Sequence, residues 1–211
     1  AGKRLYLRRY WTYERRIDSA LRLRLATRET VAADLPQRLD GLFDQPAPDG
    51  VIDWQKLACA LATRGAFSIV TGGPGTGKTT TVVRLLALLQ APAVEVGSPL
   101  RIRLAAPTGK AAARLTESIS QQVLSLKVPD SVKEKIPTQV TTVHRLLGSR
   151  PGTRHFRHHL GNPLPLDVLV VDEASMIDLE MMANLLDALP PHARLVLLGD
   201  KDQLASVEAG A

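Results

Sequence analysis

Beyond residue 52, hydrophobic and polar positions follow two alternating patterns. Short, nearly continuous apolar runs are typical of buried strands, and they occur at 66–72, 100–107, 167–174 and 193–200. Stretches in which apolar residues recur every three or four positions predict helices at 53–63, 78–90, 108–126 and 178–189. Strands and helices that alternate along a chain build a parallel sheet with helices on both faces. The pattern therefore predicts an α/β fold.

The first 52 residues follow a different pattern. Tyr10, Tyr13, Ile17 and Leu21 fall at helical spacing, with arginines on the other faces. A segment of this size is too small for its own core, so residues 1–33 are expected to be the end of an N-terminal domain. Their aromatic residues either stack nucleic-acid bases beside the arginines or pack on a neighbouring domain. Residues 34–52 are rich in Pro, Gly and Asp, which predicts a linker, and 53–211 then form the main domain.

Composition and charge narrow the class of protein. The 211 residues suffice for one full core, and no apolar run is long enough to span a membrane. The net charge of +6 arises within residues 1–29, so any electrostatic case for nucleic acid rests there. Cys59 is the only cysteine, which excludes an internal disulfide and fits a reducing, cytoplasmic location. We expect it to be a small core residue on a helix.

The candidate chemistry begins with VTGGPGTGKTTT, residues 70–81, which lies between a predicted strand and a predicted helix. It contains G-x-x-x-x-G-K-T, the pattern of a loop that binds nucleoside triphosphates. Its glycines permit positive φ and close backbone approach, so that successive N–H groups surround the phosphates. Lys78 is expected to reach the β- and γ-phosphates of ATP, and Thr79 to bind Mg²⁺. The predicted nucleotide contacts from this loop are Gly72, Gly73, Pro74, Gly75, Thr76, Gly77, Lys78, Thr79 and Thr80.

A second pattern supplies two acids. The apolar run VLVV ends in Asp172 and Glu173, at the edge of the sheet where the loop of residues 70–81 is also expected. Asp172 is predicted to hold Mg²⁺ through water, and Glu173 to orient or deprotonate the attacking water. We therefore predict ATP hydrolysis with Lys78, Asp172 and Glu173 in catalytic roles. No site for a phosphate acceptor is evident in the sequence, which disfavours a kinase.

Four further stretches complete the pattern of motifs. They are APTGKAAARL (106–115), TVHRLLG (142–148), VVDEASMID (170–178) and LLGDKDQLASVEAGA (197–211). Together with the phosphate loop they resemble the first motor domain of superfamily 1 DNA helicases, most closely those of the RecD type. The resemblance implies a RecA-like P-loop NTPase fold and an ATP-driven motor that moves 5′ to 3′ on single-stranded DNA.

The resemblance also implies roles for individual residues. Gln55 is implied to recognise the adenine base, and Gln203 to sense the γ-phosphate as a fourth catalytic residue. From the residues alone, a solvated glutamine at 55, an ordinary strand-to-helix turn at 107–110 and a capping or packing histidine at 144 stay open as alternatives. The DNA contacts that the resemblance implies are Pro107, Thr108, Gly109, Lys110 and His144.

The remaining expectations concern the assembly. By resemblance, the partners are single-stranded DNA and RecB- and RecC-like subunits, in an exodeoxyribonuclease V that repairs double-strand breaks. A second motor domain with an arginine finger is implied and is expected to be missing from these 211 residues. The chain by itself is then expected to bind Mg²⁺-ATP and to hydrolyse it very slowly. A stand-alone RecD-like helicase and a non-motor regulatory domain that binds nucleotide stay open as alternatives.

Overall fold

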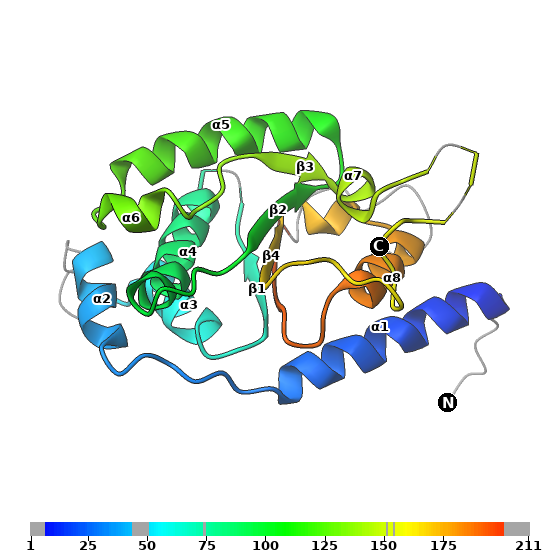
Figure 1. Cartoon of the computed structure of the whole chain (residues 1–211), viewed down its shortest axis with the longest axis horizontal. Coiled ribbons are helices and arrows are strands. Elements are labelled where there is room, and N and C mark those ends of the chain that lie inside the picture. Colours follow the sequence, from blue (N-terminus) through cyan, green and yellow to red (C-terminus); the bar gives the residue numbers. More distant parts are fainter. Residues whose placement is uncertain (1–6, 44–50, 74, 151, 154, 201–211) are drawn as a thin grey trace.

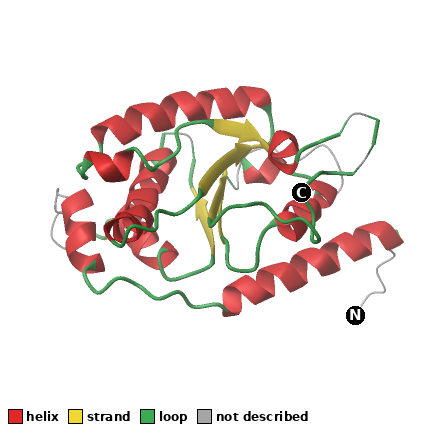
Figure 2. Ribbon diagram, in the orientation of Figure 1, coloured by secondary structure: helices red, strands yellow, loops and turns green. Residues whose placement is uncertain are grey.

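The computed structural model describes residues 7–43, 51–73, 75–150, 152, 153 and 155–200. In this part of the chain, five parallel strands form one sheet in the order β1-β5-β4-β2-β3. Figures 1 and 2 show the sheet between two groups of helices, which confirms the predicted RecA-like α/β architecture. The strands are β1 (Phe67–Thr71), β2 (Ile102–Ala106), β3 (Val140–Thr142), β4 (Val168–Val171) and β5 (Arg194–Gly199).

Alternation of side chains along the strands separates two hydrophobic cores. All four residues of β4 are buried; Val168 and Val170 belong to the first core, and Leu169 and Val171 to the second. Strand β5 divides its residues between the two cores in the same way. A strand covered on both faces has to be apolar at every position, which is why these runs are continuous in the sequence.

The helices that cover the first core are α2 (Leu35–Leu42), α3 (Trp54–Ala62), α4 (Lys78–Glu95), α5 (Gly109–Ser125) and α6 (Asp130–Lys133). Asp53 caps α3, since its side chain accepts a hydrogen bond of 2.9 Å from the backbone N–H of Lys56. Cys59 is fully buried on α3, as the sequence predicts. None of the helices within the described ranges is long and apolar enough to cross a membrane.

The second core is covered by α1 (Arg8–Ala26), α7 (Val143–Leu147) and α8 (Leu179–Ala188), after a short 3-10 turn at Ala174–Met176. Ile17 and Leu21 of α1 pack on this core, and the two alternatives for the aromatic residues of this segment stay predictions. Arg24 is 3% exposed and donates to the backbone carbonyls of Leu189 (3.2 Å) and Pro190 (3.1 Å). Helix α1 is therefore fixed to the end of α8 by both packing and hydrogen bonds.

The expectation of a linker at 34–52 is wrong for Leu35–Leu42, which form α2. Leu35, Leu39 and Leu42 lie on one face of this helix and are buried in the first core. Pro36 stands in the first turn of this helix, where its missing N–H costs no helical hydrogen bond. An eight-residue helix with one apolar stripe is stabilised mainly by packing of that stripe on the core, and such packing cannot be predicted from composition.

Candidate nucleotide site and the adjoining sheet edge

The candidate site residues gather at one edge of the sheet. Because all the strands are parallel, their carboxyl ends meet at the same edge, and the motifs follow β1, β2, β3 and β4 there. Strand β5 lies between β1 and β4, so the phosphate loop and the acids are one strand apart. The backbone N–H of Gly72 donates to the carbonyl of Gly199 at 3.3 Å, which ties the start of the loop to the end of β5.

The phosphate loop has the backbone that its glycines predict. Gly75 and Gly77 have φ of 75° and 82°, in the left-handed region, and Gly77 precedes the first residue of α4. A Cβ on Gly72 would lie 2.6 Å from the hydroxyl of Thr76, so the loop also closes tightly on itself. Helix α4 starts at Lys78 and presents its N-terminal N–H groups at this edge, the arrangement that favours anions.

Lys78 lies over its own loop. Its ammonium group donates to the carbonyl of Gly72 and, at 2.9 Å, to that of Gly73. Burial raises the pKa of the Asp172 carboxyl, while the backbone N–H of Glu173 and the charge of Lys78 partly oppose that rise. The charge of Lys78 therefore acts on the Asp172 carboxyl across β5.

Glu173 is strained. It has φ of 49° and ψ of 39°, and it is the non-glycine residue with positive φ in the described ranges. Such a backbone costs a glutamate about 1–2 kcal/mol and tends to occur where function requires an unusual side-chain direction. Beside it, the hydroxyl of Ser175 is buried and, among the described residues, makes no hydrogen bond. Ser175 had no predicted role, although it stands only two residues after Glu173.

The three threonines after Lys78 have different surroundings. The hydroxyl of Thr80 donates to Oε1 of Gln122 on α5 at 3.2 Å, and that of Thr81 donates to the carbonyl of Gly77 at 3.0 Å. Within the described residues, Thr79 makes no such side-chain bond. A free hydroxyl and the Asp172 carboxylate are oxygen ligands of the kind that Mg²⁺ takes, so these residues fit the cation.

Gln55 belongs to the same site. It stands in the first turn of α3 and donates from Nε2 to the carbonyl of Thr76 at 3.2 Å. A Cβ on Gly77 would overlap Nε2 of Gln55, so the glutamine amide lies directly over the loop. The structure thus places this side chain against the phosphate loop rather than in open solvent.

The implied DNA contacts lie at the same edge, over β2 and β3. Ala106 and Thr142 pair in register, so the starts of α5 and α7 are neighbours. Thr108 caps α5 by accepting from the N–H of Ala111 at 3.2 Å, and Lys110 is exposed in the first turn. His144 is exposed on α7 and packs edge-on against Phe156, with ring centres 6.1 Å apart. The short strand β3 and helices α6 and α7 were not predicted from the sequence.

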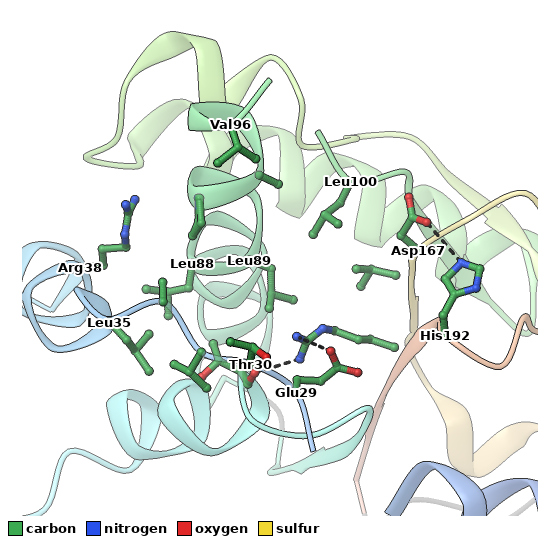
Figure 3. Close-up of a pocket in the computed structure, with 17 residues that line it drawn as sticks. Glu29, Thr30, Leu35, Arg38, Leu88, Leu89, Val96, Leu100, Asp167 and His192 are labelled. Carbon is green, nitrogen blue, oxygen red and sulfur yellow. Dashed lines mark hydrogen bonds and ion pairs between the residues drawn. The ribbon is translucent and has the colours of Figure 1, made fainter. Parts of the chain in front are cut away.

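Two of the predicted site residues, Pro74 and Gln203, lie outside the described residues. A separate pocket of about 470 Å³ opens at the opposite edge, where β4 and β5 begin (Figure 3). Its walls include Leu88 and Leu89 of α4, with Asp167 and His192 paired at 3.4 Å on its rim. The phosphate loop and the acids lie at the carboxyl edge, so this pocket is separate from the candidate nucleotide site.

A five-stranded parallel sheet, a lysine-bearing phosphate loop at the start of a helix and an acid pair across one strand define a RecA-like P-loop domain. A family model described as "AAA domain" matches residues 55–209, and the chain belongs to this family.

Curated relatives place the chain more narrowly. It is 49% identical to the RecBCD enzyme subunit RecD of Haemophilus influenzae, over 98% of this chain and 33% of that protein. The identity to RecD of Mycolicibacterium smegmatis is also 49%, over 100% of this chain and 37% of that protein. The ATP-dependent RecD2 DNA helicase of Deinococcus radiodurans is 37% identical, over 98% of this chain and 25% of that protein. The chain thus spans about a third of the length of the RecD relatives that it matches.

Solved structures agree on the fold. The UvsW helicase from bacteriophage T4 aligns with a TM-score of 0.52 at 13% identity, over 82% of this chain and 61% of that chain. At this identity the likeness concerns the architecture of the domain alone.

Proposed function

We propose that this chain is the ATP-binding part of a RecD-like DNA helicase that moves 5′ to 3′ on single-stranded DNA. The observation that carries the proposal is that Lys78, at the start of α4, lies at the same sheet edge as Asp172 and Glu173, which follow β4. In the proposed mechanism, backbone N–H groups of the loop bind the phosphates and Lys78 neutralises their charge. Mg²⁺, held by Thr79 and Asp172, would neutralise charge that develops on the phosphates. Glu173 orients or deprotonates the attacking water.

The strained backbone of Glu173 supports this role. A side chain that only caps a helix needs no left-handed backbone. A catalytic base needs its carboxylate directed at the attacking water, and an unusual backbone conformation can provide that direction. For Gln203 we propose the role of γ-phosphate sensor, on the resemblance of its motif alone. Gln55 supports ATP as the nucleotide, because its amide lies beside the loop where a base would extend from the phosphates.

We propose that single-stranded DNA crosses the adjoining starts of α5 and α7. Free N–H groups at the start of α5 suit a phosphate, and the Lys110 ammonium adds charge. The names of the relatives at 49% identity support RecB- and RecC-like partners over the stand-alone alternative, to which identity is 37%. A non-motor regulator is less well supported, because a nucleotide-binding switch needs no strained acid beside its phosphate site.

The ATPase test compares two variants of the full-length protein that contains this chain. Lys78→Gln should lose nucleotide binding and turnover, because the phosphate charge is no longer neutralised. Glu173→Gln should retain Mg²⁺-ATP binding and lose hydrolysis. Lys133→Gln, the same exchange on α6, serves as the control and should match wild type. ATP hydrolysis with single-stranded DNA that Glu173→Gln leaves unchanged would refute the assignment.

The DNA test uses salt dependence. Replacing Lys110 by Ala should weaken single-stranded DNA binding for all base sequences and reduce the slope of log K against log salt by about 0.7, the value of one phosphate contact. Lys133→Ala again is the control. An unchanged slope would remove Lys110 from the DNA interface while the ATPase proposal stands.

A further inference from the structure

Arg84 of α4 makes an unusual set of contacts. It is half-buried, yet no described carboxylate pairs with it. One N–H of its guanidinium donates to Oε1 of Gln55, with a separation of 3.4 Å. The guanidinium carbon also lies 4.4 Å from the ring centre of Phe43, the residue that ends α2. Neither contact pairs the guanidinium with an opposite charge, so the position of Arg84 calls for another explanation.

The amide of Gln55 is held at both ends. Its Nε2 donates to the carbonyl of Thr76 at 3.2 Å, and its Oε1 accepts from Arg84. A guanidinium offers only donors, and a carbonyl only accepts. If the amide turned over, its NH₂ group would face the guanidinium and its oxygen would face the carbonyl, so both contacts would become repulsive. Arg84 and Thr76 together therefore allow one orientation of the amide.

A fixed amide distinguishes between purine bases. Each contact uses one amide hydrogen or one lone pair, so one N–H and one lone pair of Gln55 remain for a ligand. Adenine presents the N6 amino donor beside the N7 acceptor, which matches a glutamine amide at both atoms. Guanine presents two acceptors, O6 and N7, and would place O6 against the amide oxygen. An amide free to rotate would lose part of this distinction.

We infer that Arg84 is a positioning residue for nucleotide selection: it holds the Gln55 amide in the orientation that accepts ATP and disfavours GTP. The inference rests on the proposed function and adds the residue that sets its base preference. The ring face of Phe43 supports the guanidinium of Arg84, so the end of α2 is connected to the phosphate loop through Arg84 and Gln55. The segment that composition marks as a linker thereby contacts the ATP site through one arginine.

The test measures kcat/KM for ATP and for GTP in the full-length protein with single-stranded DNA. Arg84→Met keeps an unbranched apolar stem and removes the guanidinium with its donors. We expect the ratio of ATP to GTP efficiency to fall about tenfold, within the range for one two-point base contact. Arg84→Lys, which keeps a donor, should restore part of the ratio. Arg64→Met is the matched control, because Arg64 is exposed at the other end of β1 and should leave the ratio unchanged.

A double-mutant cycle separates positioning from general stability. In a Gln55→Ala background, Arg84→Met should cause no further fall in the ratio, since no amide remains to be oriented. A further fall of the same size would show that Arg84 acts without Gln55, which overturns the inference. An unchanged ratio of ATP to GTP efficiency in Arg84→Met would also overturn the inference, even if the melting temperature of that variant falls.

The outcomes also distinguish this inference from the function on which it rests. If wild type neither binds nor hydrolyses ATP, the proposed function fails and the inference fails with it. If wild type hydrolyses ATP in preference to GTP and Arg84→Met retains that preference, the inference alone fails.

Discussion

Replacing Gly77 with alanine tests how closely the phosphate loop and Gln55 are fitted together. Gly77 has φ of 82°, a conformation that costs an alanine about 1–2 kcal/mol. Part of this cost is offset, by about 0.4–1 kcal/mol, because alanine also restricts the unfolded chain. The backbone term is therefore about 1 kcal/mol.

A second cost arises from the neighbouring side chain. The new Cβ would overlap Nε2 of Gln55, which is the end of a flexible side chain and can rotate away. That rotation gives up the hydrogen bond from Gln55 to the Thr76 carbonyl, worth about 1 kcal/mol. We therefore expect Gly77→Ala to lower the free energy of unfolding by about 2 kcal/mol in the absence of nucleotide.

Gly75 provides the control. Its φ of 75° imposes the same backbone cost, yet nothing lies within 4 Å of a Cβ built there. Urea unfolding, followed by circular dichroism, should therefore show a loss of about 1 kcal/mol for Gly75→Ala. In a Gln55→Ala background, the loss for Gly77→Ala should shrink to the same value. Equal losses for the two alanines in the wild-type background, or an excess that persists without Gln55, would refute the packing argument.

Substitutions at three acidic residues give further predictions. Burial raises the pKa of Asp172, so the charged carboxylate destabilises the fold, and this cost disappears as the pH falls through the raised pKa. Asp172→Asn should therefore abolish ATPase activity and yet make the nucleotide-free protein more stable at neutral pH. This gain in stability should shrink in acid. Glu173→Gly and Glu173→Gln should both be inactive. Urea unfolding should show the glycine variant to be about 1 kcal/mol more stable than the glutamine variant, because glycine adopts the left-handed backbone without strain. Equal stability of the two variants would contradict strain at this position. Hydrogen bonds from Arg101 lower the pKa of Asp167 to about 2, so this carboxylate stabilises the fold above its ordinary pKa of about 4 and stops doing so as the pH approaches 2. Asp167→Asn should cost about 1 kcal/mol near neutral pH after allowance for solvent screening, and less in acid; a loss independent of pH would contradict this origin.

Much of the geometry of the candidate nucleotide site could be predicted from the sequence because it depends on local chemistry. A loop needs glycines for positive φ and a lysine at the start of the next helix, and both requirements fall within eight consecutive residues. The acids follow a strand that is apolar at every position, and parallel strands bring such ends to one edge. The cap at Asp53 is equally local, and the structure confirms it.

Other features depend on contacts between residues far apart in the chain, and only the tertiary structure decided them. Composition at 34–52 indicated a linker. The leucines of α2 pack in the core with residues of α3 and α4, and the burial of these leucines outweighs the preference of the segment for turns. No pattern in the sequence predicted that the hydroxyl of Thr80 donates to Gln122 on α5. No sequence pattern connects Phe43, Gln55 and Arg84, because their contact exists only once three helices have packed. The sequence by itself thus determined which groups are candidates to bind phosphate, since motif chemistry is local, and packing determined which neighbours contact them.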